Sequence, residues 1–90
     1  MKKCIAALIA IMLSVAGFSQ NVSINNDGST ADNSAMLDIK STSKGILVPR
    51  LTAAQKLGIA TPATGLLIYQ TDGTTGFWYY DGSNWVNLSS

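Results

Sequence analysis

The fold of this chain is decided near its C-terminal end, in the stretch 66-LLIYQTDGTTGFWYYDGSNWVNL-88. Two Asp-Gly pairs, at residues 72–73 and 81–82, separate three runs of aliphatic and aromatic residues. Such runs favour β-strands, and Asp-Gly is typical of hairpin turns because glycine adopts positive φ freely. The stretch therefore predicts an antiparallel three-stranded β-meander with strands at residues 66–71, 77–80 and 85–88.

Both faces of this predicted meander carry apolar or aromatic side chains. If the two loops have two or four residues, alternation along the strands divides the side chains into two sets. One set contains Leu66, Ile68, Phe77, Tyr79, Val86 and Leu88, and the other contains Leu67, Tyr69, Trp78, Tyr80 and Trp85. A half-solvated antiparallel sheet alternates apolar with polar residues instead. We expect the chain to cover one face well, while the other face meets a neighbouring subunit, a ligand, or solvent at some cost in solubility.

A short helix is predicted before the meander. Thr52 and Gln55 have the S/T-x-x-E/Q spacing of a capping box, in which each side chain bonds the backbone N–H of the other residue. This signal predicts a helix that runs from residue 53 to about residue 59 and stops before Thr61 and Pro62.

Short strands complete the predicted fold. Alternating or β-branched residues indicate strands near residues 22–24, 36–39 and 46–48, with polar loops between them. Pro49 is expected to end the last of these strands because proline lacks a ladder donor. The predicted fold class is therefore mainly β with one short helix, and a C-terminal antiparallel three-stranded meander follows the short strands.

The N-terminal residues have the pattern of a helical secretory signal peptide. Lys2 and Lys3 precede an apolar run that begins at Ile5, and small residues around Phe18 suggest cleavage after Ser19. The run is shorter than the ~20 residues of a membrane-spanning helix. We expect an exported product at the cell surface, in the medium or in the periplasm, with no membrane association after cleavage.

Three segments follow from these patterns. Residues 1–19 form the predicted signal peptide, residues 20–44 the short strands and polar loops, and residues 45–90 a strand, a short helix and the meander. The exported part is one small domain at most. A domain of about 70 residues is marginally stable unless a disulfide, a metal or a partner subunit supports it.

Composition argues against an enzyme. After cleavage the chain has no Cys, His or Glu, so general acid–base chemistry would depend on Asp and Lys alone. Asp27, Asp72 and Asp81 each precede glycine and are interpreted as turn residues. We expect no catalytic residue, no cofactor and no metal. The charge balance, four basic residues against five Asp, excludes a basic nucleic-acid footprint.

The Asn-rich segment 23–34 partly fits the spacing of a calcium-binding loop. With Gly28 at the glycine position, Ser23 and Ser34 stand where the first and last acidic ligands are needed. We interpret the segment as an Asx-rich turn, with calcium binding as the weaker alternative.

Several motifs resemble a tail-fibre-like module found in exported bacterial surface proteins and phage tail fibres. They are SAMLDI at 34–39, KGILVPRLT at 44–52, TGLLIY at 64–69, FWYYDG at 77–82 and Trp85-Val86. The resemblance covers nearly all of the exported part. It implies a β-rich fibre segment in which three chains bury shared apolar surface, with a structural or adhesive role.

Three hypotheses follow for function. The first is a non-enzymatic, exported structural or adhesive module that forms a homotrimer through an aromatic sheet face. Its expected interface or binding residues are Trp78, Tyr80, Trp85, Tyr69 and Arg50. The second is a monomeric carbohydrate-binding module that stacks a glycan or another surface ligand on the aromatic rings. The third is a truncated stub of a longer fibre protein.

Overall fold

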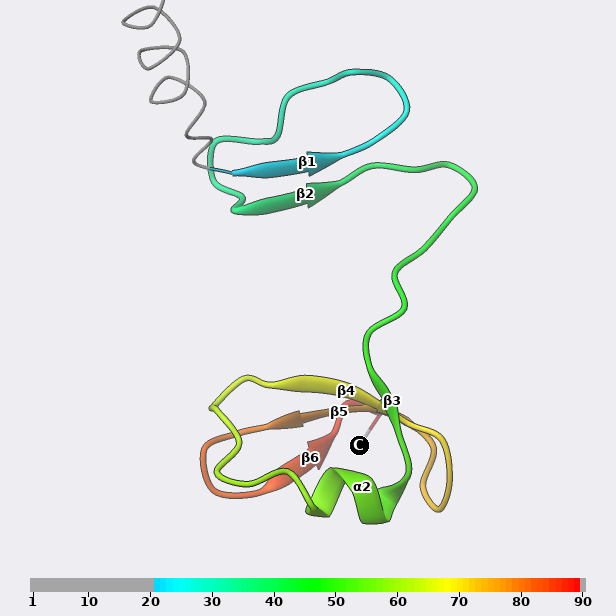
Figure 1. Ribbon diagram of the computed structural model, residues 1–90, viewed down its shortest axis with the longest axis vertical. Coiled ribbons are helices and arrows are strands. Elements are labelled where there is room, and N and C mark those ends of the chain that lie inside the picture. Colours follow the sequence, from blue (N-terminus) through cyan, green and yellow to red (C-terminus); the bar gives the residue numbers. More distant parts are fainter. Residues whose placement is uncertain (1–20, 90) are drawn as a thin grey trace, which may run out of the picture. The chain divides into compact units, whose positions relative to one another are not determined.

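The computed structural model describes residues 21–89. The predicted signal peptide lies outside the described residues. The described residues divide into two compact units, residues 21–44 and 45–89. The elements in chain order are β1 (Val22–Ile24), β2 (Leu37–Ile39), β3 (Arg50–Leu51), α2 (Ala53–Leu57), β4 (Leu67–Gln70), β5 (Gly76–Tyr80) and β6 (Trp85–Asn87) (Figure 1). The predicted fold class, mainly β with a short helix, is confirmed.

The N-terminal unit contains a two-stranded parallel sheet. β1 pairs with β2, so that Val22 lies opposite Leu37 and Ile24 opposite Ile39. The Lys40 N–H donates to the Ile24 carbonyl at 2.9 Å and closes the C-terminal end of the ladder. Both strands lie where the alternating residues predict them.

The segment between β1 and β2 is built on side chains that accept hydrogen bonds from nearby backbone N–H groups. Asn25 accepts from Gly28, Asp27 from Ser29 and Asp32 from Ser34, each at 2.9 Å. Short polar side chains stabilise loops in this way. The predicted Asx-rich turn is confirmed.

The C-terminal unit contains a four-stranded mixed sheet in the order β3-β4-β5-β6. β4, β5 and β6 form the predicted antiparallel meander, while β3 adds a parallel edge strand beside β4. Helix α2 connects β3 to β4 and lies against one face of the sheet (Figure 1). One side of the sheet is therefore covered by its own chain.

The edge strand begins after Pro49, whereas the sequence places a strand before it. Residues 46–48 form no strand, and β3 starts at Arg50. The Pro49 carbonyl accepts from the Tyr69 N–H at 2.9 Å, and the Leu51 carbonyl accepts from the Thr71 N–H at 2.9 Å. Since Pro49 has no N–H, it cannot donate the preceding rung of the ladder, and pairing starts at this residue.

The helix has the predicted capping box. The Gln55 N–H donates to Thr52 Oγ1 at 3.1 Å, and the Thr52 N–H donates to Gln55 Oε1 at 2.9 Å. The helix ends at Leu57, two residues before the predicted end, because Gly58 serves as its C-cap. Asp72 Oδ1 accepts from the Ala53 N–H at 2.6 Å, which connects the helix N-terminus to the β4–β5 loop.

The division of side chains between the two faces differs from the prediction at the first hairpin. Ile68 lies opposite Trp78, and Tyr69 lies opposite Phe77, so each pair shares a face. The loop has five residues, 71–75, whereas the prediction assumed two or four. An odd loop length exchanges the faces of the whole following strand. The second hairpin, which has a four-residue loop and pairs Tyr80 with Trp85, is as predicted.

Candidate association surface

The helix-side face of the C-terminal sheet contains the interior of this unit. Among the described residues, Ile68 is the one buried hydrophobic side chain, with 3% of its surface exposed. The paired Trp78 lies beside it on the same face, and Tyr80 and Trp85 form an edge-to-face pair with ring centroids 5.4 Å apart. These three aromatic side chains are half-buried.

Lys56 of α2 covers the tryptophans on this face. Only 5% of its surface is exposed, and Nζ lies 3.5 Å from the centroid of the Trp78 ring and 5.8 Å from that of Trp85. Desolvation by burial lowers the pKa of Lys56, while the electron-rich ring faces favour its cationic form. Its ammonium therefore occupies the ring face that a stacking ligand would need.

The five-residue loop that sets the register is stabilised by side chains of the helix-side face. Gln70 Nε2 donates to the carbonyls of Asp72 and Thr74, at 2.8 and 3.2 Å. Trp78 Nε1 donates to the same Thr74 carbonyl at 2.9 Å. Since Gln70 is buried, the loop conformation is coupled to the packing beneath the sheet.

The opposite side of the sheet, which we call the outer face, is apolar and open. The register places these residues on it: Arg50, Leu67, Tyr69, Phe77, Tyr79 and Val86. Phe77 is 44% exposed and Leu67 is 39% exposed. The rings of Tyr69 and Phe77 meet edge to face with centroids 5.1 Å apart. No helix of the described residues lies over this face (Figure 1).

A shallow apolar cavity of about 170 Å³ borders the outer face. It is lined by Ile46, Leu47, Val48, Arg50, Tyr69 and Phe77. Leu47 is 80% exposed, so the segment before β3 extends the apolar surface instead of covering it. Contiguous exposed apolar surface of this kind marks interaction sites in soluble proteins.

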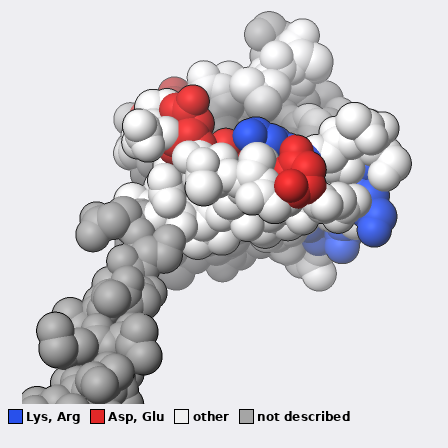
Figure 2. All heavy atoms as spheres, turned by 90° about the horizontal axis from the view of Figure 1, so that it is seen from above, with Lys and Arg blue, Asp and Glu red and all other residues white. Residues whose placement is uncertain are grey.

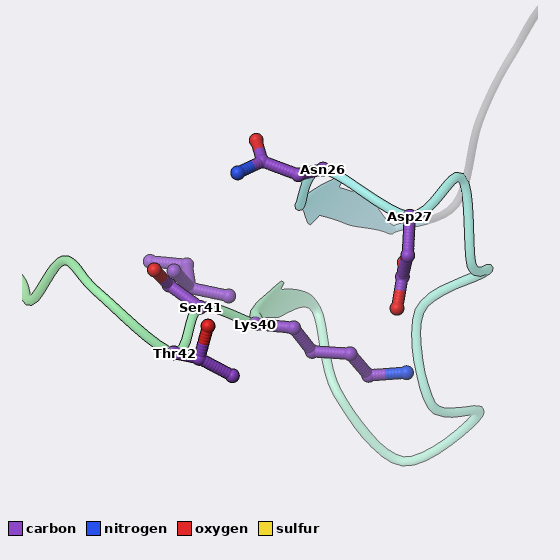
Figure 3. Close-up of a pocket in the computed structure, with 6 residues that line it drawn as sticks. Asn26, Asp27, Lys40, Ser41 and Thr42 are labelled. Carbon is purple, nitrogen blue, oxygen red and sulfur yellow. The ribbon is translucent and has the colours of Figure 1, made fainter.

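A second cavity, of about 410 Å³, lies within the N-terminal unit (Figure 3). Its lining consists of Asn26, Asp27, Ile39, Lys40, Ser41 and Thr42. Lys40 Nζ donates to Ser29 Oγ at 3.2 Å, and its side chain extends toward Asp27. Hydrogen bonds from Ser29, aided by the charge of Lys40, lower the pKa of Asp27. These polar groups support the β1–β2 loop, and the cavity has no partnerless buried group that would indicate a ligand.

Charged side chains are dispersed on the face of the molecule that Figure 2 shows. Figure 2 shows acidic and basic groups interspersed with uncharged atoms, without a large patch of one sign on the face in view. Within residues 21–89, no group of three or more His, Cys, Asp or Glu side chains could hold a metal ion. No helix of this part of the chain is long and apolar enough to cross a membrane.

The chain matches a known protein family over most of its length. The family described as phage tail like trimerisation region matches residues 23–90. The chain belongs to this family. No curated protein and no solved structure shows a significant match.

Membership in the phage tail like trimerisation region family confirms the resemblance to tail-fibre-like modules. The chain is a structural, trimerising fibre module, and its family is a trimerisation region and not a family of enzymes. A homotrimer is the assembly that this family supports.

The trimerisation region does not bring the five predicted interface residues together on one face. Trp78, Tyr80 and Trp85 lie on the helix-side face, whereas Tyr69 and Arg50 lie on the outer face. Sequence reasoning placed Tyr69 with the tryptophans because it assumed an even loop length. It therefore missed the grouping of Tyr69 with Phe77 and Leu67, which only the length of the ordered loop could have revealed.

Proposed function

We propose that this protein is an exported fibre segment that forms a homotrimer through the outer face of its C-terminal sheet. The observation that carries the proposal is the exposure of Phe77 and Leu67 on a sheet face that no helix of its own unit covers. Membership in a trimerisation family supports the stoichiometry. Export is proposed from the signal-peptide pattern of the first 19 residues.

The physical driving force is the removal of apolar surface from water, worth roughly 25 cal/mol per Å². Three outer faces that converge on a threefold axis bury the same residues in each copy, which closes the assembly and prevents open-ended growth. The edge-to-face pair of Tyr69 and Phe77 orders two large rings before association. Association therefore covers the apolar side chains that are exposed on the outer face.

Arg50 has a second role in the proposed interface. Its backbone pairs with Tyr69 in the parallel ladder, and its exposed side chain borders the apolar cavity. A guanidinium group can satisfy several carbonyl acceptors at once. We propose that Arg50 hydrogen-bonds across the rim of the trimer interface, where it limits the ways in which the three apolar faces can slide over one another.

The helix-side face is the weaker candidate for both association and glycan stacking. Lys56 covers Trp78, and Tyr80 packs on Trp85 within the same chain. No observation specifically favours a monomeric carbohydrate-binding role, and adhesion to a surface ligand stays a prediction.

The decisive variant is Phe77→Asp, with Leu57→Asp as its matched control. Both replace an exposed hydrophobic residue, but Leu57 lies on α2 and is 73% exposed. The chain is expressed for export and its molar mass is measured by size exclusion with light scattering. We expect a trimer for the parent and the Leu57 variant. We expect Phe77→Asp to be monomeric at micromolar concentration, because burying three carboxylates near one axis is strongly unfavourable.

Two outcomes would contradict the proposal. A folded parent that remains monomeric at micromolar concentration excludes self-association, and a Phe77→Asp trimer as stable as the parent excludes the outer face. Tryptophan fluorescence separates loss of assembly from loss of folding because the contact of Trp78 with Lys56 lies within one chain. If Phe77→Asp does not fold, the single variant Leu67→Asp tests the same face with a charge at a different position.

A further inference from the structure

The N-terminal unit has an apolar sheet face of its own. The parallel register places Val22, Ile24, Leu37 and Ile39 on the same side of β1 and β2. Val22 is 54% exposed, and Ile24 and Leu37 are each 55% exposed. We call these four residues the N-terminal apolar face.

The opposite face of this small sheet is already occupied by the β1–β2 loop. Ser23 and Asp38 lie opposite each other on that side. Asn25 Nδ2 donates to Ser23 Oγ at 2.6 Å, and Ser23 Oγ donates to the Ser29 carbonyl at 3.2 Å. Asp38 Oδ2 accepts from the Asp32 N–H at 2.8 Å. The loop therefore closes the polar face, whereas Val22, Ile24 and Leu37 on the apolar face are each more than half exposed and Ile39 is half-buried.

Two strands of three residues each are too small to be stable without further packing. The match to the trimerisation family begins at residue 23, within β1, so the N-terminal unit is part of the trimerisation region. Copies that run in the same direction along a fibre present equivalent faces to one another at each level of the axis. A second and a third copy of the chain are therefore the occupants that the exposed face and the family match favour.

We propose that the N-terminal apolar face is a second self-association surface, which packs against the same face of the other two copies. This proposal rests on the trimer proposed above and adds a contact that does not involve the outer face. Each copy supplies the apolar layer that the β1–β2 loop cannot supply, because the loop is polar and hydrogen-bonded to the other side. The trimer is then held together by one surface in each of the two units.

Disulfide cross-linking tests the contact directly. Ile24→Cys is introduced into the full chain in a Cys4→Ala background, which leaves no other cysteine. Thr30→Cys is the matched control because Thr30 is exposed but belongs to the loop on the polar side. Mild oxidation is carried out on the assembled trimer at a protein concentration below micromolar. It is expected to convert the Ile24→Cys variant largely to covalent dimers, because one cysteine per copy can link only two copies. Thr30→Cys is expected to remain monomeric on a denaturing gel.

A second cysteine position tests whether the result depends on a disturbance of β1 by Ile24→Cys. Val22→Cys places the thiol two residues earlier on the same face and should cross-link in the same way. Ile24→Asp should raise the protein concentration at which the trimer dissociates by about tenfold or more, since it buries a charge at the contact. The matched Thr30→Asp change should leave that concentration within about twofold of the parent, as surface substitutions usually do.

The outcomes distinguish this proposal from the previous one. If Phe77→Asp abolishes the trimer but Ile24→Cys stays uncross-linked in the intact trimer, the N-terminal contact is wrong and the outer-face interface stands. That result would also follow if another part of the same chain covered the N-terminal apolar face. If the parent is monomeric, both proposals are wrong.

Discussion

Lys56 and Trp78 show how one pair of side chains can determine which face of a sheet is internal. A lone lysine in a short helix is ordinarily read as a solvent-exposed residue. Here the aliphatic stem of Lys56 is buried and its ammonium lies on the Trp78 ring. Lysine thus replaces the apolar residue that an interior position would usually carry.

Gly82 is a position at which a single methyl group should be costly. Its φ is +104°, and an added Cβ would lie 2.8 Å from Thr64 Oγ1. We predict that Gly82→Ala lowers the free energy of unfolding by about 2–3 kcal/mol, the sum of backbone strain and a steric clash. Gly65→Ala is the control, because Gly65 also has positive φ but has no atom within 4 Å of the added Cβ.

Urea unfolding at one fixed protein concentration measures both glycine variants, since association contributes to apparent stability. Gly65→Ala should cost about 1 kcal/mol from conformation alone. Equal losses for the two variants would show that Thr64 moves away without cost.

Asp81 makes stability depend on pH. Hydrogen bonds from the Asn84 and Ser83 N–H groups lower the pKa of Asp81 below its ordinary value of 3.8. A lowered pKa means that the folded state binds fewer protons than the unfolded state. Its contribution to stability is therefore present above the ordinary pKa and is lost as the pH falls through and below it.

We predict that Asp81→Asn reduces the decline of stability with acid, because asparagine keeps an oxygen acceptor for the turn but does not titrate. The free energy of unfolding is measured from about pH 7 to about pH 3 for both proteins. The same acid-side slope in parent and variant would contradict the assignment to Asp81.

At the scale of elements, α2 is too short to be stable by itself. A helix of five residues lies well below the ~12–15 that isolated peptides need. It is held by the capping box, by the bond from the Ala53 N–H to Asp72 and by the packing of Lys56. The capping box is recognisable in the sequence because its two partners are three residues apart, whereas the Asp72 contact spans 19 residues.

Thr52 should therefore be important for the stability of the C-terminal unit. We predict that Thr52→Ala costs about 1 kcal/mol of unfolding free energy, since the Gln55 N–H loses its acceptor. Thr52→Ser retains the hydroxyl and should stay within about 0.5 kcal/mol of the parent. Tryptophan fluorescence during urea unfolding reports the change through the contact of Lys56 with Trp78. Equal losses for the alanine and serine variants would rule out the hydroxyl as the cause.

The strands show where sequence reasoning fails at this scale. The positions of β4, β5 and β6 follow from apolar runs between Asp-Gly pairs, and each strand forms within one residue of its predicted limits. The faces of β5 depend on whether the preceding loop has an odd or even number of residues. The five-residue loop is stabilised by hydrogen bonds from Gln70 and Trp78 to the Thr74 carbonyl, and the residue types of the loop alone do not reveal these contacts.

At the scale of the whole molecule, the two units share one feature, an apolar sheet face that we propose is covered by self-association. Each has one face closed by its own chain, by α2 in the C-terminal unit and by the β1–β2 loop in the N-terminal unit. Each leaves an apolar face exposed. Self-association at both faces would cover the exposed apolar surface of each unit.

The sequence by itself determined the mainly β fold class, the capping box, the Asp-Gly turns and the tail-fibre-like family, because these depend on residues close together in the chain. Only the tertiary structure decided that β3 follows Pro49 and that Phe77 shares a face with Tyr69. It also decided that Lys56 covers Trp78. These features depend on contacts between distant segments, and a one-residue difference in a loop exchanges the inside and the outside of a strand.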